Sequence, residues 1–166
     1  MNASQRLAAA AAAVVAGSVI PAHAADAVNV KKAPIDTIFE QGPLNPYSKF
    51  FTGTTYLTML SNNDAVFNAP IGNVTFEPGA RTFWHKHTGG QILLVLSGEG
   101  RYQERGKPVQ IIKKGDVVRI APNVEHWHGG GLESWMTHIS VETNVPNNKS
   151  IWLDPVTDAQ YRGNEK

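Results

Sequence analysis

The sequence contains no cysteine, which excludes disulfide bonds and any metal site built on thiolates. It also lacks a block of charge of one sign, since 15 Lys and Arg residues balance 14 Asp and Glu residues. A basic footprint for nucleic acid is therefore missing, and we expect no nucleic-acid partner. The 166 residues fit a single domain, and a hydrophobic content of 42% is typical of a chain with an apolar core.

The N-terminus carries an apolar run that is too short and too weakly apolar for a transmembrane helix. Residues 7–20 follow Arg6 and precede the small-residue motif Ala22-His23-Ala24. This order predicts a signal peptide over residues 1–24, cleaved between Ala24 and Ala25. Because no twin arginine is present, the general secretory route is favoured. We expect a periplasmic protein without membrane contact after cleavage; the alternative is an uncleaved N-terminal anchor.

Helical periodicity is missing from most of the mature chain. Residues 25–50 contain three prolines and predict an extended N-terminal arm. Short strand-like runs separated by Gly and Pro turn signals follow, and they predict one antiparallel sandwich or barrel domain over residues 51–166. The runs are 54–60, 71–77, 82–87, 91–97, 100–104, 109–112, 117–120 and 135–143. One short C-terminal helix is expected after Thr157, because Gln160 completes a capping box with it.

All five histidines of the predicted mature chain lie between positions 85 and 138. His85 and His87 are two residues apart on a predicted strand, so both side chains point to the same face, and His126 and His128 repeat the arrangement. If the sheet curls, the two pairs converge on one point. Imidazole suits Zn, Fe, Ni and Cu, and an added oxygen ligand favours Mn or Fe. The alternative is a set of separate hydrogen-bonded histidines, which two aligned His-x-His pairs make a poorer explanation.

Two segments resemble the paired motifs of the cupin family. The first is GARTFWHKHTGGQ (residues 79–91), followed by Gly98, with Gln91 where most cupins have Glu. The second is GDVVRIAPNVEHWHG (residues 115–129), with one extra residue before its proline and Val124 in place of the usual glycine. The resemblance implies an all-β fold, namely a cupin (double-stranded β-helix or jelly-roll) barrel with an N-terminal arm and a short C-terminal helix.

Within that family, the chain resembles small bacterial cupins of the manganese-dependent hydroxynitrile lyase type, which are associated with carboxymuconolactone decarboxylases. It shares with them Gly-Ala-Arg-Thr-x-Trp-His, His-Trp-His-Gly and Met-Thr-His. The resemblance implies one divalent metal ion, Mn in the first place, with Fe, Zn or Ni as alternatives. The implied ligands are His85, His87, Gln91 and His126. The implied catalytic or substrate-facing residues are His128 and His138, with Phe83 and Glu142 as candidate pocket residues.

Three functions are compatible with this ligand set, and its chemistry favours one of them. Three neutral imidazoles and a neutral amide leave the metal's double positive charge uncompensated, which favours a Lewis acid that polarises a carbonyl or holds an alkoxide. His128 and His138, with an ordinary pKa near 6.5, would move protons beside it; the alternative for them is a supporting, hydrogen-bonded role. We therefore expect a lyase acting on a small hydroxyl-bearing molecule. An Fe or Mn dioxygenase and a non-enzymatic periplasmic binding protein are the alternatives.

The resemblance also bears on assembly. Small cupins usually pair or form tetramers, so a homodimer or homotetramer is expected, and the N-terminal arm is long enough to reach a neighbouring copy. The expected partner at the site is a small-molecule substrate.

Overall fold

Short antiparallel strands make up most of the molecule. The computed structural model describes residues 31–164, and the predicted signal peptide lies outside them. The strands are β1 (Phe51–Thr52), β2 (Thr55–Asn63), β3 (Asn68–Phe76), β4 (Arg81–Thr82), β5 (His85–His87), β6 (Gln91–Glu104), β7 (Gln110–Lys113), β8 (Val117–Ile120), β9 (His126–Gly130), β10 (Met136–Glu142) and β11 (Ser150–Trp152). A single turn of 3-10 helix, η1 (Ser48–Phe50), precedes β1, and one helix, α1 (Asp158–Arg162), ends the chain. None of the helices in this described part is long and apolar enough to cross a membrane.

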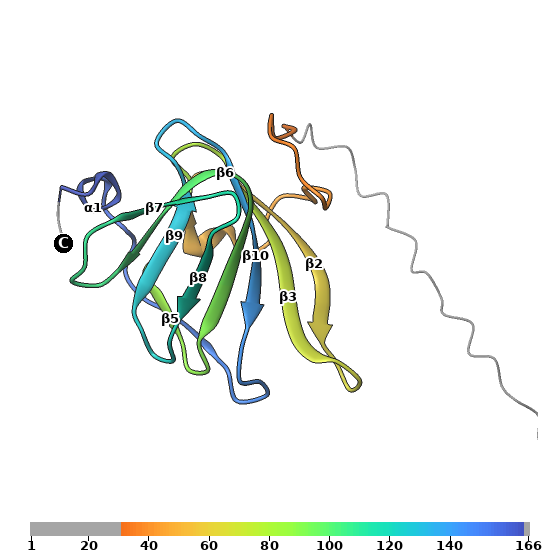
Figure 1. The fold of residues 1–166 in the computed structure, drawn as a ribbon. Helices are drawn as coiled ribbons and strands as arrows, with labels where there is room; N and C mark the ends of the chain where they lie inside the picture. The colour runs from red at the N-terminus through yellow and green to blue at the C-terminus, as the bar shows by residue number, and fades with distance from the viewer. Residues whose placement is uncertain (1–30, 165–166) are drawn as a thin grey trace, which may run out of the picture.

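The strands form one sheet with the order β1-β4-β9-β6-β10-β3-β2, which curls around an interior (Figure 1). The 14-residue strand β6 holds the two sides together. Its first part pairs with β8 and β10, and its second part pairs with β7 and β9. The separate runs 91–97 and 100–104 predict a turn at Ser97-Gly98 between them, and this is wrong, because one strand continues through both residues. Gly98 instead adopts a φ of 74° close to the register shift between β6 and β10, where the strand passes from one side of the barrel to the other.

Gly98 tolerates no side chain. A Cβ atom there would lie 2.0 Å from the backbone oxygen of Trp135, and its positive φ is unfavourable for other residues. We expect Gly98→Ala to lower the free energy of unfolding by roughly 2–5 kcal/mol, from backbone strain and overpacking together. Gly106→Ala is the control, because Gly106 has a similar φ of 79° but open space around it. That variant should lose only about 1 kcal/mol in urea unfolding. Equal losses in the two variants would contradict the steric explanation.

Most of the predicted strands are present with small shifts at their ends. The predicted run 82–87 is split into β4 and β5. The predicted runs do not include β1, β9 or β11, and β1 and β11 have at most three residues each. The predicted C-terminal helix is confirmed: Thr157 caps α1, and its capping box with Gln160 is complete. The described part of the arm runs beside β2, where Leu44 bridges to Tyr56.

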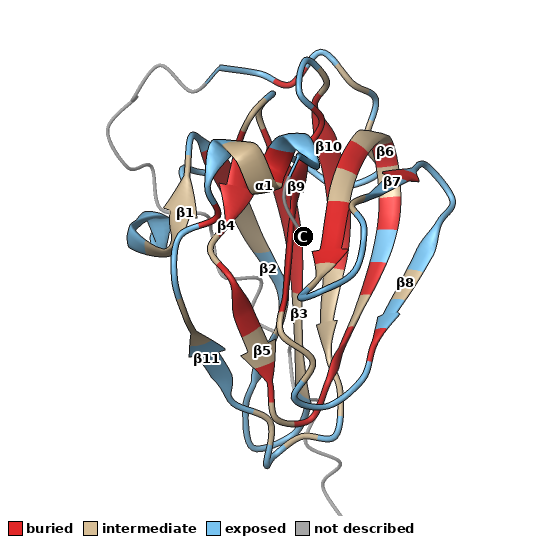
Figure 2. Cartoon of the chain, turned by 90° about the vertical axis from the view of Figure 1, so that its left-hand side faces the viewer, coloured by how far each residue is buried: buried red, intermediate tan, exposed pale blue. Residues whose placement is uncertain are grey.

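Apolar side chains gather on both sides of the strands that carry the histidines. Inside the barrel, Phe76, Leu93 and Met136 belong to the main core and are fully buried. Outside, Trp127 packs with Trp84, Val156 and Tyr161 beneath α1 in a second cluster. Figure 2 shows that β5, β9 and β10 carry buried positions, whereas most positions of β8 and β11 are exposed or half-buried. Because the second cluster holds Trp127 on the outer face of β9 and Trp84 just before β5, the inner faces of the two strands are free to carry a site.

Candidate metal centre

The inner faces of β5 and β9 bring four histidine rings together. His85 lies directly opposite His126 in the register of the two strands, and their ring centroids are 4.1 Å apart. His87 and His128 each lie on the same strand face as these two, with ring centroids 5.2 Å and 5.3 Å from His85. All four side chains are buried. The sheet therefore converges the two His-x-His pairs, as their spacing predicts.

Gln91 adds an oxygen atom to this group. Its Oε1 lies 3.1 Å from Nε2 of His126, and its Nε2 donates a 2.8 Å hydrogen bond to Oγ of Ser140. An amide can present either end to a neighbour, and the bond to Ser140 on β10 turns the oxygen toward the histidines. The structure thus gathers Gln91, His85 and His126, three of the four ligands that the resemblance implies.

The outer nitrogen atoms of the rings are held by backbone carbonyls. Nδ1 of His85 lies 3.0 Å from the oxygen of Phe83, and Nδ1 of His126 lies 2.9 Å from that of Val124. A carbonyl only accepts, so each Nδ1 carries the proton and each Nε2 keeps a lone pair facing inward. In His87, Nε2 is buried without a hydrogen-bond partner among the described residues. Inward lone pairs and a buried unpaired nitrogen are what a bound cation would satisfy, so the residues present fit a metal ion.

Two histidines, His87 and His128, compete for the place of third histidine ligand beside His85 and His126. One nitrogen from each of His85, His126 and His128 lie within 4.8 Å of one another, and this is the three-residue group that could hold a metal among the described residues. It contains His128, whereas the resemblance implies His87. However, Nδ1 of His128 already lies 3.1 Å from Nε2 of His138, while Nε2 of His87 is unpaired. The assignment of His87 as a ligand therefore stays a prediction.

Burial keeps the histidines uncharged at neutral pH. Loss of solvent lowers the pKa of His87, His126 and His138 to about 4. It lowers the pKa of His85 and His128 well below the ordinary value, and neighbouring histidines add to the effect. The ordinary pKa near 6.5 that was expected from the sequence for His128 and His138 does not apply to these buried rings. Neutral imidazoles offer their lone pairs to a metal or to a proton.

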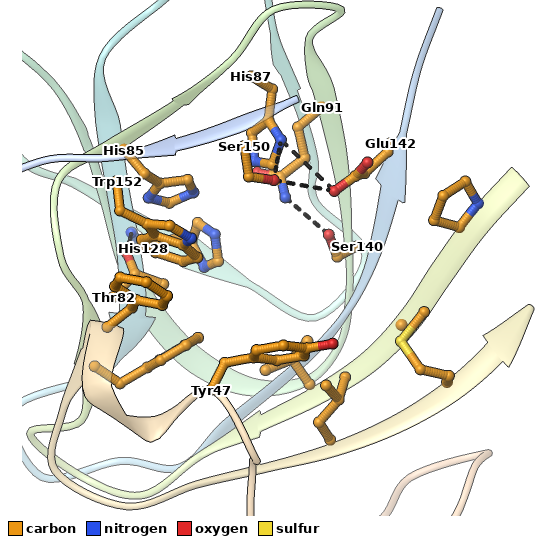
Figure 3. A pocket seen from close by; sticks show the side chains of 17 residues that line it. Tyr47, Thr82, His85, His87, Gln91, His128, Ser140, Glu142, Ser150 and Trp152 are labelled. Atoms are coloured by element: carbon orange, nitrogen blue, oxygen red, sulfur yellow. Dashed lines mark hydrogen bonds and ion pairs between the residues drawn. The ribbon is translucent and has the colours of Figure 1, made fainter. Parts of the chain in front are cut away.

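A cavity of about 440 Å³ opens beside the histidines (Figure 3). Its polar wall is formed by Thr82, His85, His87, Gln91, His128, Ser140, Glu142 and Ser150. Its apolar wall is formed by Tyr47, Phe50, Phe51, Leu57, Met59, Pro70, Gly72, Val74 and Trp152. Of the two predicted catalytic residues, His128 lines the cavity and His138 lies behind it, against the His128 ring.

The predicted pocket residues behave differently. Glu142 is part of the cavity wall, and Phe83 is not among its described lining residues. The aromatic wall comes instead from Phe50, Phe51 and Trp152, with Trp152 stacked on Phe50 at 4.6 Å. Sequence reasoning missed these residues because they come from the end of the arm, from β1 and from β11, which meet only in the folded chain.

Comparison with known proteins agrees with this architecture. Residues 72–131 match the family model described as Cupin domain. The chain is 41% identical over 119 residues to the (R)-mandelonitrile lyase of Granulicella tundricola, covering 68% of this chain and 86% of that protein. The chain belongs to the cupin family. The resemblance carried by the two histidine motifs is thereby confirmed.

Solved structures support the same fold for this cupin. The crystal structure of a cupin-like protein from Thermotoga maritima is 50% identical, with a TM-score of 0.74, and covers 79% of this chain and 98% of that one. A predicted oxalate decarboxylase from the same organism is 24% identical, with a TM-score of 0.54, over 67% and 91% of the two chains. The second likeness concerns the fold alone. The all-β cupin fold is thus established, while the reaction must be argued from the site.

Proposed function

We propose that this cupin is a metal-dependent lyase that cleaves or forms the carbon–carbon bond beside a hydroxyl group in a small substrate. The observation that carries the proposal is the uncharged donor set, in which the amide oxygen of Gln91 faces His126 at 3.1 Å. The similarity to an (R)-mandelonitrile lyase supports it. Cyanohydrins are accordingly the substrate class to test first.

His85, His87, Gln91 and His126 would hold the metal, for which we propose Mn²⁺. When bound, it would supply Lewis-acid stabilisation of the substrate's carbonyl or alkoxide oxygen, undiminished by a negatively charged ligand. The apolar wall of the cavity would hold the remainder of the substrate away from water. A phenyl ring matches Phe50, Phe51 and Trp152 in size and chemistry.

His128 would move the substrate's proton. It lines the cavity, and its Nδ1 lies 3.1 Å from Nε2 of His138. The other ring nitrogen of His128, Nε2, is therefore the one available to the substrate. When Nδ1–H of His128 donates to His138, Nε2 accepts the hydroxyl proton of a cyanohydrin. The C–O bond becomes a carbonyl, the bond to the nitrile carbon breaks, and its electron pair leaves with cyanide. Return of the proton gives hydrogen cyanide and an aldehyde, so atoms and electrons balance.

The test is to load the purified protein with Mn²⁺ or Fe²⁺ and to measure benzaldehyde release from mandelonitrile. Oxygen uptake with catechol is followed in parallel. We expect aldehyde release that disappears on treatment with a chelator and returns with the metal, and no oxygen uptake. Absence of aldehyde with either metal would overturn the proposal, and oxygen uptake would favour a dioxygenase instead.

A further inference from the structure

One face of β10 contacts three different members of the site in succession. His138, Ser140 and Glu142 alternate along the strand, so their side chains share the inner face. His138 lies against His128, and Ser140 accepts the hydrogen bond from Gln91. Glu142 accepts a 3.2 Å hydrogen bond from Oγ of Ser150 on β11. The first two contacts hold residues that are already assigned to the site, and the third leads to His87.

Ser150 links Glu142 to His87. Ser150 lies directly opposite His87 in the pairing of β11 with β5, and its Oγ is 3.2 Å from Nδ1 of His87 (Figure 3). A hydroxyl has one proton, and here it is donated to the carboxylate of Glu142, which only accepts. The Ser150 oxygen can therefore only accept from His87, so Nδ1 carries the ring proton. This leaves the lone pair on Nε2, the buried nitrogen that has no partner among the described residues.

Glu142 is also the one acidic residue among the described residues that line the cavity. Its side chain is 27% exposed, and Oε1 lies 3.8 Å from Nδ1 of His87, so solvent screens its charge only in part. Glu104 also lies near the site, on the strand beside His126, but Lys107 and the hydroxyl of Tyr102 both bind its carboxylate. Glu142 has no such basic partner among the described ion pairs apart from His87.

We propose that Glu142 and Ser150 form a carboxylate–hydroxyl relay that orients His87 as a ligand and supplies the negative charge that Gln91 withholds. The inference rests on the proposed metal site and on His87 being part of it. Glu142 and Ser150 are then positioning residues, and neither takes a proton from the substrate. The carboxylate of Glu142 acts on the ligand His87 through Ser150 and is not itself a ligand. It therefore strengthens metal binding while the four ligands stay neutral.

The test measures the affinity of the full chain for Mn²⁺ by calorimetric titration, without substrate. Glu142→Gln and Ser150→Ala should each weaken binding about 10-fold, within the range of about 10–100-fold typical of partners that orient metal ligands. The double variant should be no weaker than the weaker single variant, because both changes break the same relay. Ser150→Thr, which keeps the hydroxyl, should restore the affinity. Glu99→Gln is the matched control, since the Glu99 side chain is 43% exposed and pairs with Lys113 at 3.1 Å.

Each other outcome has a distinct meaning. Additive losses in the double variant would overturn the relay, because Glu142 would then act without Ser150. Unchanged affinity in both single variants, or in His87→Ala, would overturn the inference while leaving the metal site standing. Absence of both Mn²⁺ and Fe²⁺ binding by the wild-type protein would overturn the proposed function itself. Thermal unfolding of every variant verifies that it is folded before its affinity is compared.

Discussion

Replacing His87 with alanine should empty the metal site, whereas replacing His128 should leave the metal bound and abolish activity. Nε2 of His87 is buried and unpaired among the described residues, while Nδ1 of His128 is engaged by His138. We expect His87→Ala and His126→Ala each to weaken Mn²⁺ binding by more than about 100-fold, beyond the effect of losing an orienting partner. His128→Ala should lower kcat by about 10²–10⁴-fold, the usual contribution of a proton-transferring residue. Elemental analysis after dialysis and mandelonitrile cleavage measure the two effects.

This experiment also decides whether His87 or His128 joins His85 and His126 as the third histidine ligand. His85 and His126 belong to both, so His126→Ala is the reference for complete loss of a ligand. If His128→Ala lost as much metal as His126→Ala, the ligands would be the mutually close His85, His126 and His128. His87 would then support the site rather than bind the metal. His138→Ala serves as a control, because it changes the partner of His128 and touches no expected ligand.

Trp127→Ala should bring the protein close to unfolding, with a loss of about 3–5 kcal/mol in the free energy of unfolding. The side chain of Trp127 is fully buried beneath α1, in edge contact with Trp84 at 6.5 Å and against Tyr161 at 5.5 Å. Its Nε1–H donates a 2.8 Å hydrogen bond to the buried Oε1 of Gln103. A domain of this size is stable by roughly 5–15 kcal/mol, so the loss is a large part of the total. Urea denaturation followed by circular dichroism measures it.

Trp127→Phe separates packing from hydrogen bonding. It keeps an aromatic ring but leaves Oε1 of Gln103 without its donor, which should cost about 1–3 kcal/mol. Because Trp127 lies between His126 and His128 on the opposite face of β9, both variants should also loosen the site. A loss below about 1 kcal/mol for Trp127→Ala, well under that of a buried aromatic residue, would mean that the outer cluster does not support the barrel.

Local periodicity accounts for how well parts of the site could be predicted. The alternation of side chains along a strand places His85 with His87 and His126 with His128, and only the curvature of the sheet is needed to join the pairs. The capping box of Thr157 and Gln160 is equally local, and the predicted helix is present. The prediction of a turn at Ser97-Gly98 was wrong because it also rested on a local pattern. A glycine with positive φ is typical of a turn, and here it lies within β6, where the strand changes partners.

The fold class and the set of histidines could be predicted from the sequence alone, because strand alternation and motif spacing are properties of residues close together in the sequence. Which nitrogen of each ring faces inward is fixed only in the folded protein, since backbone carbonyls and Ser150 on β11 set the tautomers. The aromatic wall is also a product of folding, because Phe50 meets Trp152 across about a hundred residues of chain. Contacts of that separation depend on how the sheet closes, and no local pattern records them.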